Sequence, residues 1–303
     1  MKKLIRGGAI ICSSAVLLAS CSNSGSDSKE SNSEKIHMGD ILSNKNEHIS
    51  YILTDDNPIE KNTNIDFYVV TKDGKAKVYD GTGDTTLGDV AKMDDKKIKE
   101  RMAKEDKEWF EKDKKETLDA LNEGIDKVAE IKKGYHEKKS DGEKGKKAYE
   151  YTKKYIDEHG NVPQKAKDKI EKTKYTEPKF SDLKISAKTD GSGNETEKET
   201  FKFKAHGFKT TGVDQSEDYD SQDYYFTDSS VQTSAKFEND LNLTEEYEDT
   251  VAVTDIFDKK YAGLSMIDED DEDKVNYIVT EVGDKAKEVK MDSPKAKYID
   301  KVD

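Results

Sequence analysis

The sequence predicts a mixed α+β protein in which antiparallel β hairpins or sheets at both ends flank a long charged helical segment. Two observations support this class. Runs of β-branched and aromatic residues that alternate with polar ones lie in residues 36–85 and again in residues 176–303. Residues 86–175 lack that alternation, and their apolar residues recur every three or four positions among many lysines and glutamates.

The start of the chain has the composition of an export signal. Residues 1–20 contain three basic residues, then an apolar stretch, then the small residues Ala19 and Ser20 directly before Cys21. The apolar stretch is shorter than the roughly 20 residues that a transmembrane helix needs. The chain becomes polar over residues 22–28 and lacks the basic flank of a stop-transfer helix.

This pattern resembles the signal peptide and lipobox of bacterial lipoproteins, and the lysine bias is similar to that of Gram-positive, staphylococcal-type surface lipoproteins. The resemblance covers residues 1–21 and implies cleavage before Cys21 and attachment of a diacylglyceryl group to its thiol. Two acyl chains, at about 0.8 kcal/mol per buried CH₂, hold a protein on a bilayer stably. The resemblance therefore implies an extracytoplasmic protein, lipid-anchored to the outer face of the bacterial cell membrane. The alternative is a secretory signal with an incidental cysteine.

The composition allows only a modest core. Apolar residues make up 32% of the 303 residues and charged residues 39%, which is close to the composition of disordered chains. Fifteen tyrosines and nine phenylalanines, several of them in strand-like runs, nevertheless indicate folded segments. The length fits one elongated domain or two small ones.

Charge and cysteine content exclude several kinds of site. The net charge is −14, and loss of the three positive charges in residues 1–20 makes the remainder more acidic. Arg101 is the only arginine after that segment, and specific phosphate recognition favours arginine, so we expect no nucleic-acid partner. With Cys12 removed and Cys21 acylated, no thiol remains for a disulfide, a nucleophile or a metal.

Residues 21–35 form the lipid-anchored tether that follows the signal. Serine, asparagine and glycine predominate in them, and such a segment behaves as a coil with a root-mean-square span of roughly 20 Å. Residues 36–85 then predict β structure. A run from Ile65 to Thr71 precedes Asp73-Gly74, which is typical of a tight hairpin, and residues 76–79 return.

Residues 86–175 predict two antiparallel helices. The first helix has one apolar face, which contains Leu118, Leu121, Ile125 and Val128. A sparser apolar stripe continues this face upstream through Ile98, Met102 and either Trp109 or Phe110. A capping box at residues 140–143 predicts the start of a second helix, with Tyr151, Tyr155 and Ile156 buried and with Gly160 and Pro163 at its end. A helical hairpin with solvated faces is the simpler interpretation, and a coiled-coil seam for a partner is the alternative.

Residues 176–303 return to strand patterns. Alternating residues from Leu183 to Ala187 and from Phe201 to Ala205 flank a turn at residues 190–194, which predicts a hairpin. Further strands are predicted around Tyr224 and Phe226, Val251 and Val253, and Tyr277-Ile278-Val279. The segment from Tyr277 through Gly283 to Lys287 repeats the pattern around Asp73-Gly74, which predicts a second similar hairpin. Whether the two β regions share one sheet is left open.

No residue pattern predicts catalysis, a metal site or a cofactor. The five histidines are His37, His48, His136, His159 and His206, and none has metal-ligand spacing. His206, beside Gly207, is the best candidate for a functional imidazole, although a structural or solvent-facing role is the simpler interpretation. Gly81-Thr82-Gly83 lacks the third glycine of a phosphate loop and is read as a simple loop.

Two acidic clusters are candidate calcium ligands. Residues 268–273 are six consecutive acids, and the other cluster contains Asp214, Glu217, Asp218, Asp220 and Asp223. The first cluster lacks the glycine and spaced glutamate of an EF-hand loop, and a solvated hairpin tip or edge-protecting charge is the simpler interpretation. The lysine-rich residues 144–147 are candidates for contact with acidic wall polymers, with a solvated helix face as the alternative.

Cys21 is thus the one position with a predicted chemical role, as the site of lipidation. We expect a non-catalytic surface lipoprotein that contacts the bilayer through acylated Cys21 and binds an unknown protein or cell-wall partner. A solute-binding lipoprotein of a transporter is the first alternative, although such proteins usually alternate strands and helices in two lobes. An extracytoplasmic enzyme that uses dispersed carboxylates is the second.

The lipobox predicts that Cys21 is the first residue of the mature chain and that its thiol carries a diacylglyceryl group. Mass spectrometry of protein extracted from membranes with detergent measures both features. A Cys21→Ser variant lacks the thiol and should show no added acyl mass. An unmodified Cys21 in the wild-type protein, or a different N-terminal residue, would contradict the prediction.

Overall fold

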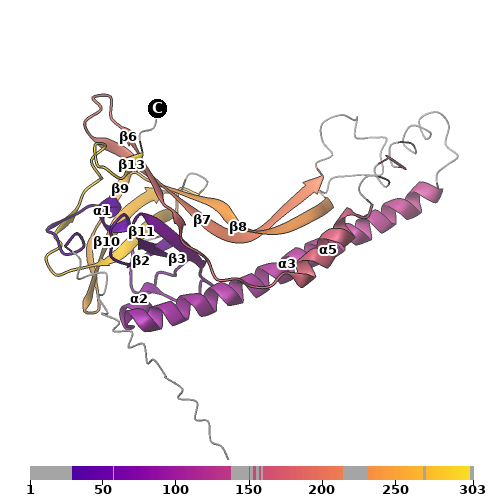
Figure 1. The fold of residues 1–303 in the computed structure, drawn as a ribbon, viewed down its shortest axis with the longest axis horizontal. Coiled ribbons are helices and arrows are strands. Elements are labelled where there is room, and N and C mark those ends of the chain that lie inside the picture. The colour runs from indigo at the N-terminus through magenta and orange to yellow at the C-terminus, as the bar shows by residue number, and fades with distance from the viewer. Residues whose placement is uncertain are drawn as a thin grey trace, which may run out of the picture.

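The computed structural model describes residues 29–56, 58–137, 150, 153–154, 157, 160–213, 231–268 and 271–300. The predicted mixed α+β class is confirmed, with strands predominating and with one long helix (Figure 1). The helices are α1 (Met38–Leu42), α2 (Leu87–Ala91), α3 (Asp95–Glu137) and α5 (Val162–Lys172). Within the described residues, no helix is both long enough and apolar enough to cross a bilayer.

The strands belong to a large sheet, a smaller sheet and a short parallel pair. The first strands in the chain are β1 (Lys35–Ile36), β2 (His48–Asp55), β3 (Phe67–Lys72), β4 (Lys75–Asp80), β5 (Ser181–Asp182) and β6 (Lys184–Thr189). The remaining strands are β7 (Thr196–Val213), β8 (Val231–Tyr247), β9 (Asp249–Ile256), β10 (Lys259–Ile267), β11 (Val275–Val282), β12 (Glu288–Val289) and β13 (Ile299–Asp300).

The two β regions of the sequence share one sheet, which settles the question that the sequence left open. Its seven strands are antiparallel and follow the order β5-β4-β3-β2-β11-β10-β9. β2 and β11 join the N-terminal and C-terminal strands, with Leu53 opposite Tyr277. Side chains alternate along β3, so that Val69 enters the core on one face while Tyr68 and Val70 enter the core on the other.

The second sheet has four strands in the order β13-β6-β7-β8. β6 and β7 form the predicted hairpin, in which Ile185 lies opposite Phe201. β7 and β8 continue as a ribbon of 18 and 17 residues that extends away from the large sheet beside α3 and α5 (Figure 1). Phe201, Phe203 and Tyr247 of this sheet pack into the same core as Val69.

The predicted turn at Asp73-Gly74 is confirmed. Both residues have positive φ, 52° and 68°, which joins β3 to β4 through two residues. The similar hairpin predicted after β11 is wrong, because the chain leaves the sheet at Gly283 and β12 pairs in parallel with β1. A glycine at position 283 instead lets the backbone pass close to the Asn32 side chain, since a Cβ there would lie 2.8 Å from Asn32 Cβ.

The N-terminal segment is attached to the C-terminal one by backbone hydrogen bonds. Ser31 O accepts from Gly283 N at 2.9 Å, and Glu34 O accepts from Lys287 N at 3.0 Å. These residues belong to the predicted tether, and the bonds place its described end on the folded body. Residues 1–28, with Cys21, lie outside the described residues.

α3 has 43 residues and follows the predicted apolar stripe. Asp94 accepts a hydrogen bond from Lys97 N at 2.9 Å and begins the helix. Leu121 is buried against Ala166 and Ile170 of α5 and Ala235 of β8. The helix that Gly160 and Pro163 were predicted to end lies largely outside the described residues, and residues 160–161 form a turn. Pro163 lies in the first turn of α5, where its missing N–H removes no helical hydrogen bond. The capping box at 140–143, Tyr151, Tyr155 and Ile156 lie outside the described residues.

Two buried carboxyl groups join the C-terminal segment to the rest of the fold. Asp292 accepts hydrogen bonds from Gly39 N of α1 and from the Tyr298 hydroxyl, both at 2.8 Å, and its own backbone N–H donates to Glu199 of β7. Burial, together with the nearby charge of Asp292, raises the pKa of Glu199 well above its ordinary value. Glu199 is therefore protonated at neutral pH and can donate.

The free energy of unfolding should decrease less with rising pH in Glu199→Gln than in the wild-type protein. Above pH 4.5 the unfolded chain loses this proton while the folded protein keeps it, so wild-type stability decreases as pH rises toward the folded pKa. Glutamine removes that difference, which amounts to at most about 1.4 kcal/mol per pH unit. Urea unfolding at pH 5 and pH 8 measures it. Glu197→Gln, an exposed position on the same strand, should keep the wild-type slope. A wild-type slope in Glu199→Gln would contradict the prediction.

Candidate functional site

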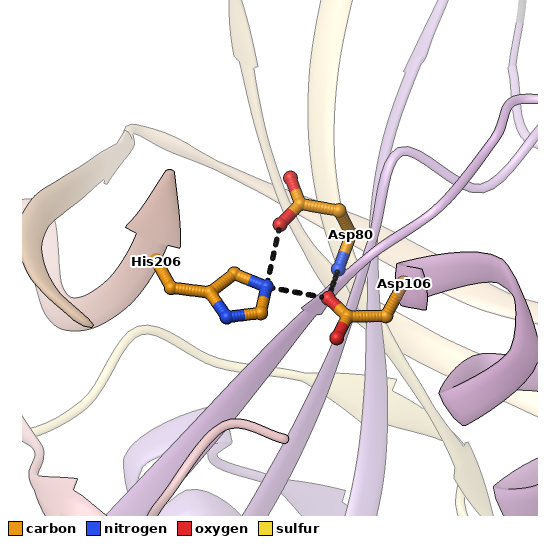
Figure 2. Close-up of side chains that lie close together, drawn as sticks. All are labelled: Asp80, Asp106 and His206. Carbon is orange, nitrogen blue, oxygen red and sulfur yellow. Dashed lines mark hydrogen bonds and ion pairs between the residues drawn. The ribbon is translucent and has the colours of Figure 1, made fainter. Parts of the chain in front are cut away.

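Three titratable side chains from distant parts of the chain meet in the interior. They are Asp80 at the end of β4, Asp106 on α3 and His206 on β7 (Figure 2). The His206 Nε2 atom lies 2.8 Å from Asp106 Oδ1 and 3.6 Å from Asp80 Oδ2. The side chains of His206, Asp106 and Asp80 are 1%, 0% and 7% exposed. The group is therefore shielded from water, and its charges interact strongly.

Local structure explains how each side chain reaches the cluster. Asp106 lies four residues from both Met102 and Phe110, so it shares the buried face of α3. A bulge in the β7–β8 ladder between Ala205 and Gly207 displaces His206 from the regular register.

Asp106 is the central acceptor of the cluster. Its Oδ1 accepts from His206 Nε2 and from Asp80 N, each at 2.8 Å, and its Oδ2 accepts from the Tyr175 hydroxyl at 2.7 Å. Asp106 thus joins α3 to β4, to β7 and to the segment after α5.

The cluster holds protons at neutral pH. Burial, with the charge of Asp106, raises the pKa of Asp80 to about 7. Burial alone would lower the pKa of His206, but the hydrogen bond to Asp106 and the charges of Asp106 and Asp80 outweigh it and raise that pKa. An imidazole and two carboxylates can exchange protons or bind a metal ion.

Aromatic rings enclose the imidazole. Trp109 is parallel to it, with ring centroids 6.2 Å apart and an interplanar angle of 9°. Phe237 and Tyr175 approach it at 5.4 Å and 6.2 Å. This packing restricts rotation of His206 and holds Nε2 toward the two carboxylates.

An open hollow of 510 Å³ lies next to the cluster. Asp80 and Trp109 line it, together with Asp66 of the β2–β3 connection and Glu245 of β8. Burial raises the pKa of Asp66, and burial with the charge of Asp66 raises the pKa of Glu245 to about 7. Gly81-Thr82-Gly83 forms part of the wall, so this loop lies at the candidate site.

The sequence singled out His206 but neither of its partners. The structure places His206 in the interior, so the solvent-facing interpretation is wrong. Asp106 had one signal, its four-residue spacing from Met102 and Phe110. That signal was weak because acidic residues are frequent throughout α3.

The other sequence candidates lie elsewhere. His37 is near Met291 O at 3.2 Å, and His48 is buried, which lowers its pKa. The acids at 268–273 lie at the turn between β10 and β11, as predicted for a hairpin tip, although residues 269–270 are outside the described residues. Cys21, His159, residues 144–147 and residues 214–223 also lie outside them, and nothing is described of the His136 side chain.

Comparison of the chain with protein-family models, with curated proteins and with solved structures gives no match.

Proposed function

We propose that this protein is a non-catalytic surface lipoprotein whose ligand occupies the hollow beside Trp109. Acylated Cys21 holds the chain at the outer face of the bacterial membrane, and the folded body binds a protein or cell-wall partner. The proposal is supported by the lipobox at its N-terminus and by the carboxyl groups that gather at the hollow.

The carboxyl groups carry the argument for the ligand's chemistry. Within the described residues, no ion pair joins Asp66 or Glu245 to a lysine or an arginine, although Lys112 lines the same hollow. Burial raises the pKa of both carboxyl groups, because it removes their ionised forms from water. A ligand with a positive charge supplies a partner for these ionised forms, so the hollow favours cationic ligands.

Trp109 adds a second feature that suits a cation. Trp109 lines the hollow and is half-buried, and an ammonium group is attracted to the face of an indole ring. We therefore assign the hollow to primary ammonium groups, as carried by lysine side chains of a partner protein or a cell-wall peptide.

One observation favours the alternative of an extracytoplasmic enzyme. The hollow joins Asp66 and Glu245, two carboxyl groups with raised pKa values, and pairs of this kind activate water in acid–base hydrolysis. A bound peptide that is cut rather than released would favour this function over simple binding.

Trilysine should bind the hollow, and the fluorescence of Trp109, the only tryptophan, should report it. Titration at pH 7.5 should saturate, and trilysine acetylated on its side chains should need at least tenfold more peptide because it lacks the ammonium charges. Glu245→Gln should weaken trilysine binding about tenfold, equivalent to about 1.4 kcal/mol.

The matched control is Glu130→Gln, an exposed position far along α3, which should leave the affinity unchanged. Equal affinity for the two peptides, equal loss in both variants, or no saturation by millimolar trilysine would overturn the proposal. Mass spectrometry of the incubated peptide tests the enzymatic alternative, since fragments absent with Glu245→Gln would show hydrolysis at this site.

A further inference from the structure

We infer that Asp80, Asp106 and His206 form a binding site for a divalent transition-metal ion, with zinc as the first candidate. The inference is independent of the ligand proposed for the hollow, because it depends on different side-chain atoms in the interior. Of the described residues, these three form the group of acidic and histidine side chains whose geometry suits a metal.

The distances between the donor atoms carry the inference. One atom from each residue lies within 4.8 Å of the others, and Nε2 of His206 is 2.8 Å and 3.6 Å from the two carboxylate oxygens. Zinc bonds nitrogen and oxygen at about 2.0–2.2 Å, so tetrahedral ligand atoms stand about 3.3–3.6 Å apart. The 3.6 Å between His206 Nε2 and Asp80 Oδ2 already matches this spacing, and the 2.8 Å between His206 Nε2 and Asp106 Oδ1 must widen by about 0.5–0.8 Å to admit the ion.

A buried oxygen that accepts no hydrogen bond provides a second observation. Asp80 Oδ2 is buried and makes no hydrogen bond, although it points toward the imidazole of His206 (Figure 2). A buried carboxylate oxygen that accepts no hydrogen bond is costly. A cation between Asp80 and His206 would give this oxygen a ligand bond.

The surrounding residues match the requirements of a metal site. The Tyr175 hydroxyl donates a hydrogen bond to Asp106 Oδ2 and fixes the orientation of that carboxylate. Carboxylates that bind metal ions are usually held by hydrogen bonds of this kind. Trp109 packs on the imidazole and fixes its plane. Asp80 also lines the hollow, which offers an entry path and an open side for a water or another ligand.

The donor set selects the kind of ion. One imidazole and two carboxylates suit zinc and neighbouring divalent transition metals, whereas calcium takes six to eight oxygen ligands. Two carboxylates also balance the charge of a divalent ion once the imidazole is neutral. We therefore expect selectivity for zinc over calcium.

Isothermal titration calorimetry of the chelator-treated protein with zinc chloride at pH 7.5 tests the site. We expect one zinc ion per chain, bound at least 100-fold more tightly than calcium. His206→Gln and Asp80→Asn should each weaken zinc binding at least 100-fold. His37→Gln is the matched control, since His37 also lies beside a buried carboxylate, at 3.8 Å from Asp292, and it should bind zinc as the wild type does.

Cobalt supplies a second measurement that does not depend on heat. Its visible absorption should show nitrogen and oxygen coordination in the wild type and should disappear in Asp80→Asn, whose fold is checked by far-ultraviolet circular dichroism. Absence of tight zinc binding by the folded wild type would overturn the inference, as would equal binding by Asp80→Asn and the wild type. Trilysine titration of metal-free protein keeps the test of the hollow separate.

Discussion

The fold depends on one buried carboxylate, that of Asp106. It accepts hydrogen bonds from the backbone at the end of β4, from His206 on β7 and from Tyr175 after α5. These partners belong to the large sheet, to the small sheet and to the segment that returns along α3. A buried charge is tolerated only when its acceptors are satisfied, so these elements must meet in one arrangement for α3 to bury Asp106. The long ribbon and the long helix are positioned by the same contact.

Buried acidic groups lie at two of the places where distant segments of this acidic chain meet. Glu199 and Asp292 join β7 to the C-terminal segment and to α1, and Asp80 ends β4 beside both Asp106 and the open hollow. Burial beside another carboxyl group disfavours ionisation and raises the pKa of both Glu199 and Asp80. Apolar residues are only 32% of the chain, so hydrogen-bonded polar contacts define junctions that a larger apolar core would otherwise define. The same groups give the interior its capacity to bind protons or cations.

Short sequence patterns correctly predicted a turn and a helix, but they did not predict which distant strands pair. The turn at Asp73-Gly74 was predictable because those residues adopt positive φ, and the apolar stripe of α3 was predictable from its period. The pairing of β2 with β11 was not, since either strand pattern fits several neighbours. The second hairpin was wrongly predicted at Gly283, because the sequence alone does not distinguish a glycine needed for close packing from one needed for a turn. His206 was noticed as a rare residue type, whereas Asp106 was one acid among many on α3.

Urea unfolding of Asp106→Asn, followed by Trp109 fluorescence and by far-ultraviolet circular dichroism, tests the central role of Asp106 most directly. Asparagine keeps the shape but loses the charge and one acceptor, so a donor is left unpaired in the interior. We expect the free energy of unfolding to fall by about 3 kcal/mol. Asp126→Asn, an exposed change on the same helix, should alter it by less than about 0.5 kcal/mol. Equal small effects of the two substitutions would contradict the account.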